Sequence, residues 1–161
     1  MTQVFLGLGS NLDREKNIHA GLVALKNIFG DVVLSNVYES ESVGFKGSNF
    51  YNLVASLETD LTIACLSVVL KKIEDANGRL RTGPKYSPRT LDIDILSYGE
   101  FVGTEAGVEL PRAEITENAF VLLPLSELAP HELHPRLKKS YAELWASYGQ
   151  GAQKLWKIDH I

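Results

Sequence analysis

The sequence predicts an α+β fold, a mainly antiparallel sheet with helices packed on it. Two segments, residues 13–29 and 63–73, repeat apolar side chains at spacings of mostly three and four, the period of an amphipathic helix. Other short runs are apolar or β-branched and are bounded by turn residues, as strands are: residues 4–8, 32–38, 50–58 and 90–99. The order strand–helix–strand–strand–helix–strand predicts a ferredoxin-like sandwich with its helices on one sheet face.

Both helices have recognisable ends. Gly30 follows the first one, where glycine commonly ends a helix, and Asn77-Gly78 closes the second. The strand at 4–8 is expected to end in a turn at residues 9–11. The apolar faces of the two helices consist of Ile18, Leu22, Leu25 and Phe29, and of Ile63, Leu66, Leu70 and Ile73.

The strand at residues 50–58 has two different faces. Tyr51, Leu53, Ala55 and Leu57 share one parity and form a plain core face, whereas Phe50, Asn52, Val54 and Ser56 share the other. Beyond the last strand we expect a turn over 99–107 and a short polar stretch over 112–118. A closing helix is expected from Leu137, Leu144 and Trp145.

Size and charge restrict the class of protein. The 161 residues, 45% apolar and 22% charged, predict a single domain over residues 1–161. A net charge of −4 gives no basic footprint for nucleic acid or an anionic membrane, and disfavours an RNA-binding module. Cys65 is expected to be a small buried hydrophobe, and because it is the single cysteine no internal disulfide can form. The N-terminus lacks a signal-peptide pattern, so a cytoplasmic protein is expected.

Two aspartates interrupt the apolar strand near residue 90. Leu91, Ile93 and Ile95 alternate with Asp92 and Asp94, so period two places both carboxylates on the face opposite the core. Neighbouring carboxylates repel unless a cation lies between them, and Mg²⁺ takes oxygen ligands of this kind. The pair is therefore a candidate metal site.

A cationic segment precedes the aspartates. It is either a solvated charged loop or, with the carboxylates, a polyphosphate site whose loop closes over the ligand; together the two features favour phosphate. We expect this loop, residues 79–89, to be mobile without ligand. Its cations are Arg79, Arg81, Lys85 and Arg89, with Lys71 or Lys72 upstream.

Two other candidates have competing interpretations. Phe50 and Asn52 could hold a flat heterocycle by stacking and hydrogen bonding, or Phe50 could pack in the core. Glu74, taken by itself, is interpreted as an exposed helical charge. The four histidines show no metal-ligand spacing.

Four segments, in this order and spacing, resemble the 6-hydroxymethyl-7,8-dihydropterin pyrophosphokinases of folate biosynthesis. They are FLGLGSNL, FYNLVASLET, GRLRTGPKYSPRTLDIDIL and FVLLPLSELAP, and the resemblance covers about residues 4 to 135. PRTLDIDIL is the most specific part. The resemblance implies a ferredoxin-like transferase that moves the β,γ-pyrophosphoryl group of ATP to a reduced pterin and releases AMP.

The resemblance also implies residue roles. Asp92 and Asp94 would hold two Mg²⁺ ions and, with Arg79 and Arg89, carry out catalysis. The implied nucleotide-site residues are Lys71, Glu74, Arg81, Lys85, Tyr86, Arg112 and Asn118. The implied pterin-site residues are Ser40, Val43, Gly44, Phe50, Asn52 and Phe120. The expected partners are these small molecules only, with no nucleic acid or membrane, and the chain is expected to be a monomer.

Several positions depart from the pattern of that family. Arg112 stands where a histidine is expected and Asn118 where an arginine is expected; Lys71, Lys85, Tyr86 and Phe50 also differ from the usual residues. Arg112 and Lys71 could replace the cation missing at Asn118. The alternative function is a paralogue that uses another pterin or has lost the transfer activity.

Overall fold

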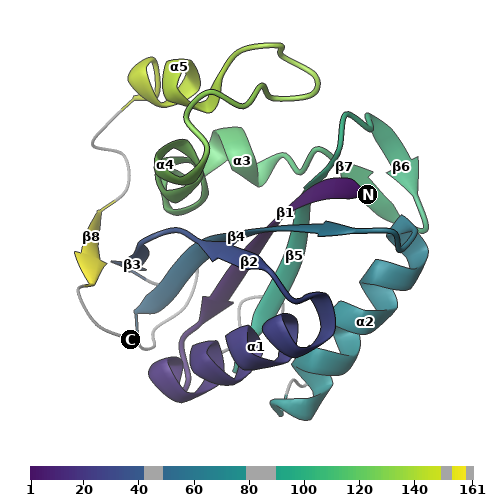
Figure 1. Ribbon diagram of the computed structural model, residues 1–161. Helices are drawn as coiled ribbons and strands as arrows, with labels where there is room; N and C mark the ends of the chain where they lie inside the picture. The colour runs from purple at the N-terminus through teal and green to yellow at the C-terminus, as the bar shows by residue number, and fades with distance from the viewer. Residues whose placement is uncertain (42–48, 79–89, 150–153, 159–161) are drawn as a thin grey trace.

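The computed structural model describes residues 1–41, 49–78, 90–149 and 154–158, and its centre is a six-stranded sheet (Figure 1). The strand order is β5-β1-β4-β3-β8, with β2 beside β3 on the same edge of β4, and every pairing is antiparallel. The strands are β1 (Thr2–Ser10), β2 (Val32–Leu34), β3 (Val37–Ser40), β4 (Phe50–Thr59), β5 (Asp92–Tyr98) and β8 (Leu155–Ile158).

Two helices cover one face of the sheet, as the sequence predicts. Figure 1 shows α1 (Arg14–Phe29) and α2 (Ile63–Ala76) packed on the same side. Gly30, at φ 80°, ends α1, and the Thr62 hydroxyl accepts a hydrogen bond from the Cys65 N–H at the start of α2. The predicted apolar face of β4 forms the core here, since Tyr51, Leu53, Ala55 and Leu57 are all buried.

The opposite face also carries helices, so the expectation of helices on one face was wrong. There lie α3 (Glu114–Glu117), α4 (Ala119–Leu128) and α5 (Tyr141–Ala146). Phe5, Val54 and Leu96 supply an apolar strip on three strands, and α4 packs on this strip through Leu122 and Leu125. The resulting second cluster covers only part of this face.

Two boundaries of the predicted strands differ in the structure. The expected strand 32–38 is divided into β2 and β3, because the Ser35 hydroxyl accepts the Val54 N–H at 2.8 Å in place of a backbone carbonyl. Gly9 and Ser10, expected in a turn, are the last residues of β1. Gly9 pairs with Asn52 on one side and with Asp92 on the other.

Elements after residue 99 follow the prediction only in part. The expected turn and the residues after it form a hairpin of β6 (Gly103–Glu105) and β7 (Val108–Leu110). The polar stretch contains α3. Leu144 and Trp145 belong to α5, whereas Leu137 lies before it and is exposed. β8 was not expected, because its four residues are too short to show a period; it pairs with β3.

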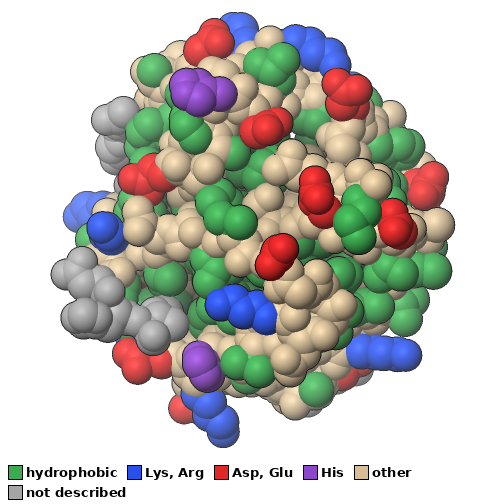
Figure 2. Space-filling model, viewed as in Figure 1, with side chains coloured by type: hydrophobic (Ala, Val, Ile, Leu, Met, Phe, Trp, Pro, Cys, Tyr) green, Lys and Arg blue, Asp and Glu red, His purple; other side chains and the backbone are tan. Residues whose placement is uncertain are grey.

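Cys65 is exposed, which corrects the prediction of a buried thiol. The period of α2 turns Ile63 and Leu66 into the core and leaves Cys65 and Val68 facing outward. In the part of the chain that the structure describes, no helix has the length and apolar character needed to cross a bilayer. Figure 2 shows acidic, basic and hydrophobic side chains interspersed over the face in view.

Candidate active site

Asp92 and Asp94 lie on the same face of β5 and line the same cavity. Leu91, Ile93 and Ile95, which alternate with them, are at most 5% exposed and belong to the core beneath the sheet. The two aspartates pair with Gly9 and Gly7 of β1. Because these glycines have no side chains, the space beside both carboxylates stays open.

The cavity has a volume of about 320 Å³ and lies beside α4, where the second apolar cluster ends. Apolar walls with a few polar groups are typical of small-molecule sites. The structure brings seven of the predicted site residues together here: Ser40, Phe50, Asn52, Asp92, Asp94, Asn118 and Phe120. Seven others lie outside the described residues: Val43, Gly44, Arg79, Arg81, Lys85, Tyr86 and Arg89. The expected mobility of the 79–89 loop concerns residues outside the described ranges.

Gly7 and Gly9 form the floor of the cavity, a role that the sequence did not reveal. A Cβ atom on Gly9 would lie 2.8 Å from Asn52 Oδ1, and one on Gly7 would lie 3.3 Å from a Leu96 methyl carbon. Asn52 therefore lies directly across Gly9, and its Nδ2 donates to Ser40 Oγ at 3.3 Å. The glycines allow a flat amide to lie close to the strand backbone.

Glu74 is buried at 6% exposure, so its interpretation as an exposed helical charge was wrong. Its Oε2 accepts a hydrogen bond from the Ile93 N–H at 2.8 Å. Among the described strands β5 lies at the edge of the sheet, so its Ile93 N–H has no strand partner there and is satisfied by this carboxylate. Glu74 therefore attaches α2 to β5 between the two aspartates.

A second cavity of about 360 Å³ adjoins the first through Asp94. Three predicted nucleotide-site residues, Lys71, Glu74 and Arg112, line it. These three residues and the aromatic pocket therefore lie in two different cavities that share Asp94. Sequence spacing alone could not show this division.

Arg112 is held at the rim by Glu114, a residue that the sequence analysis did not select. Arg112 Nε donates to Glu114 Oε2 at 2.6 Å, Nη2 also contacts this carboxylate, and Nη1 lies 3.9 Å from Asp94 Oδ1. The backbone N–H of Arg112 donates to the Leu96 carbonyl at 2.9 Å. The guanidinium is therefore oriented by two contacts before any ligand arrives.

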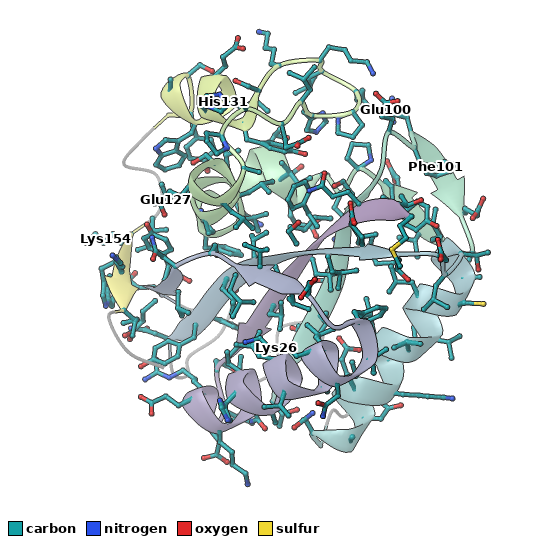
Figure 3. The ribbon with its side chains drawn as sticks, in the orientation of Figure 1. Lys26, Glu100, Phe101, Glu127, His131 and Lys154 are labelled. Carbon is teal, nitrogen blue, oxygen red and sulfur yellow. The ribbon has the colours of Figure 1, made fainter. Side chains whose placement is uncertain are left out.

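Two further contacts fix the walls. The Ser10 hydroxyl, fully buried, lies 2.5 Å from the Thr90 carbonyl oxygen, which ties the end of β1 to the chain two residues before β5. Tyr38 Oη donates to Glu127 Oε1 at 2.5 Å and joins β3 to α4 (Glu127 is labelled in Figure 3). Burial, and then Glu127, raise the pKa of the Tyr38 hydroxyl above its ordinary value, so it stays a donor.

The carboxylate oxygens at the cavity suit a hard cation that takes only part of its coordination shell from the protein. Among the described residues, no three His, Cys, Asp or Glu side chains form a group that could hold a metal ion. The pair Asp92 and Asp94 offers carboxylate oxygens only. Mg²⁺ commonly binds through one or two carboxylates and completes its shell with water and phosphate oxygens, whereas zinc prefers closed sets of nitrogen and sulfur ligands.

Fold and site together describe an α+β protein with a cavity in which two neighbouring carboxylates, Asp92 and Asp94, meet aromatic and amide side chains. The family model for 7,8-dihydro-6-hydroxymethylpterin-pyrophosphokinase matches residues 5–130. The chain belongs to this family, and it is a transferase of the pyrophosphokinase class.

Curated relatives carry the same description. The chain is 35% identical over 145 residues to the 2-amino-4-hydroxy-6-hydroxymethyldihydropteridine pyrophosphokinase of Aquifex aeolicus, covering 89% of this chain and 90% of that protein. It is 33% identical to the Haemophilus influenzae enzyme of the same name, covering 80% and 82%.

Solved structures support the fold. The Plasmodium falciparum HPPK-DHPS with pteroate matches with a TM-score of 0.73 at 16% identity, over 92% of this chain and 42% of that one. This chain thus spans less than half of the length of that larger protein. The predicted α+β, ferredoxin-like fold class is confirmed.

Proposed function

We propose that this protein transfers pyrophosphate from ATP to 6-hydroxymethyl-7,8-dihydropterin and releases AMP, a step of folate biosynthesis. The hydroxymethyl oxygen would attack the β-phosphorus, the bond from that phosphorus to the bridging oxygen of the α-phosphate would break, and AMP would leave with that oxygen. The hydroxyl proton would pass to solvent. The observation that carries the proposal is one cavity in which an aromatic and amide pocket adjoins Asp92 and Asp94.

The pterin would lie over the glycine floor. We assign Phe50 and Phe120 to the two sides of the ring and Asn52 to its amide edge, with Ser40 supporting Asn52 through their 3.3 Å hydrogen bond. Stacking and paired amide hydrogen bonds suit a flat heterocycle with donors and acceptors on one edge. Val43 and Gly44 are assigned to this pocket on the family resemblance alone.

The triphosphate would lie on the other side of Asp94, towards the second cavity. Lys71 and Arg112 would contact phosphate oxygens there, with Asn118 at the rim, and Glu74 would hold the aspartate strand in place. Asp92 and Asp94 would hold two Mg²⁺ ions, which would neutralise phosphate charge and one of which would lower the pKa of the attacking hydroxyl. The roles of Arg79, Arg81, Lys85, Tyr86 and Arg89 rest on the family resemblance.

The direct test is product formation. Protein, ATP, Mg²⁺ and 6-hydroxymethyl-7,8-dihydropterin should yield AMP and the pterin diphosphate in equal amounts, measured by chromatography. Omitting either the pterin or Mg²⁺ should stop AMP release. If no AMP forms at high enzyme concentration, the proposed transfer is wrong.

The departures from the family pattern at Arg112, which is paired with Glu114, and at Asn118 favour a second candidate, a paralogue with another pterin or without transfer activity. In that case Arg112→His combined with Asn118→Arg should raise activity with the hydroxymethylpterin many-fold. Under the main proposal the wild-type protein is already active, and the double variant changes turnover only slightly. The single domain over residues 1–161, the monomer and the cytoplasmic location stay predictions.

A further inference from the structure

We propose that Arg14 is a positioning residue for the pterin pocket, acting from the reverse side of the sheet. It would hold the backbone of the β3–β4 pair, whose other side carries Ser40, Phe50 and Asn52. The identity of the ligand is taken from the proposed function, whereas the positioning role is argued from the contacts of Arg14 alone.

The contacts of Arg14 join α1 to both strands. Its Nη1 lies 3.2 Å from Glu39 Oε2 on β3 and donates to the Asn49 carbonyl, just before β4, at 3.1 Å. Its guanidinium carbon lies 4.0 Å above the centre of the Tyr51 ring on β4. Asn49 Nδ2 donates to the same Glu39 oxygen at 3.0 Å, which closes the cluster.

Strand register connects this cluster to the pocket. Glu39 pairs with Tyr51, and the next pair along is Ser40 with Phe50. Because side chains alternate across a strand, Glu39 and Tyr51 face α1, while Ser40 and Phe50 face the cavity that they line. A shift of the backbone at the cluster therefore moves the pocket residues by a similar amount.

The position of Arg14 is unfavourable for its own helix. It is the first residue of α1, where the helix dipole favours an anion, and the preceding Asp13 has a positive φ of 44°. The contacts across to β3 and β4 offset this cost. The side chain of Arg14 is 27% exposed and that of Glu39 is 17% exposed, so solvent screens the pair only in part.

The chemistry of the cluster requires a guanidinium. A planar group can stack on the Tyr51 ring while its edge donates to a carboxylate and to a carbonyl oxygen, whereas a lysine ammonium acts as a point charge. Arg14→Lys should therefore restore only part of the pterin affinity that Arg14→Met loses. The matched control is Lys26→Met, an exposed cation of the same helix that is labelled in Figure 3.

The test separates the two ligands. Calorimetry with 6-hydroxymethyl-7,8-dihydropterin and with a non-hydrolysable ATP analogue plus Mg²⁺ should show, for Arg14→Met, a pterin Kd raised about tenfold and a nucleotide Kd changed by less than about twofold. Lys26→Met should match the wild type. An unchanged pterin Kd, or a parallel loss of both ligands, overturns the inference.

A ligand-free measurement keeps the inference independent of the proposed function. Amide hydrogen exchange of Tyr51 and Asn52, followed by NMR, should be faster in Arg14→Met than in the wild type, while exchange in β5 stays unchanged. If the wild type binds no pterin, the proposed function fails and exchange alone decides the positioning role. Should Arg14→Met not fold, Glu39→Gln, which keeps the side-chain shape, takes its place with a smaller shift in the same direction.

Discussion

The two faces of the sheet differ in how completely they are covered, although the same strands form both. Beneath α1 and α2, every inward position of β1 from Val4 to Leu8, and of β4 from Tyr51 to Leu57, is apolar and buried. On the other face, the same strands carry Phe5 and Val54 under α4, but then Gly7, Gly9 and Asn52, which line the cavity and are covered by none of the described helices. One face provides stability, and the other leaves a cavity built on a rigid support.

Loss of a carboxylate from the open face should have the largest effect. Asp94→Asn keeps the shape of the side chain but removes its charge, so we expect turnover to fall by at least about a hundredfold because the seat for the cation is lost. The Asp94 side chain is 48% exposed, so the fold should be retained. The exposed Asp31→Asn is the matched control, and near-normal turnover of Asp94→Asn would remove the pair from catalysis.

A methyl group on the glycine floor should come next. Gly9→Ala places a Cβ 2.8 Å from Asn52 Oδ1 and must displace that amide, so the pterin Kd should rise about tenfold or more. Nucleotide binding should change little. Gly149→Ala, where a Cβ meets nothing within 4 Å, serves as control. Equal pterin binding by both variants would show that Asn52 does not read the ring.

The rim arginine should have a smaller effect. Arg112→Met removes a cation from the side of Asp94, and the Kd for the Mg²⁺-bound ATP analogue should rise about fivefold to tenfold. Pterin binding without nucleotide should stay the same. Arg136→Met, at an exposed arginine that does not line the cavity, is the control in the same calorimetric titration. Unchanged nucleotide affinity would place Arg112 outside the nucleotide site.

The smallest effect is a pH dependence of stability beside α5. The Nδ1 of His134 accepts the N–H groups of Arg136 and Leu137 at 3.2 and 3.1 Å, and burial lowers its pKa below the ordinary 6.5. The unfolded chain therefore binds the proton first as pH falls below about 6.5, and stability is lost there and kept above it.

His134→Asn tests this dependence. The asparagine oxygen can accept the same two N–H groups but does not titrate, so the melting temperature should fall less between pH 7.5 and pH 5.5 than it does in the wild type. Equal falls in both proteins would show that His134 does not contribute.

The covered face could be predicted from sequence because its signal is local. Period two in Tyr51 to Leu57 and period 3.6 in α1 and α2 each lie within one segment. The second layer could not be predicted in this way. α4 is apolar except for Ser126 and Glu127 and contains Pro124, so it shows little amphipathic pattern. β8 needs β3 as a partner to exist as a strand.

The site was predictable where it depends on side chains that alternate between the two faces of a strand. Asp92 and Asp94 share one face of the strand and Ile93 lies on the other, and the alternation of polar and apolar residues in the sequence predicts this. Glu74 could not be placed in advance, because its burial depends on an edge-strand N–H that is 19 residues away. Gly9 was expected in a turn. The reason for a glycine at this position is the close approach of Asn52 from a neighbouring strand, which the local sequence does not show.

The central claim is that Asp92 and Asp94 bind nucleotide through a divalent cation at the edge of the pterin pocket. The most direct measurement is a calorimetric titration of the non-hydrolysable ATP analogue into wild type and Asp94→Asn, with Mg²⁺ and with EDTA. The account predicts tight binding only for the wild type with Mg²⁺, and pterin binding to that complex afterwards. Equal nucleotide affinity in all four titrations would contradict it.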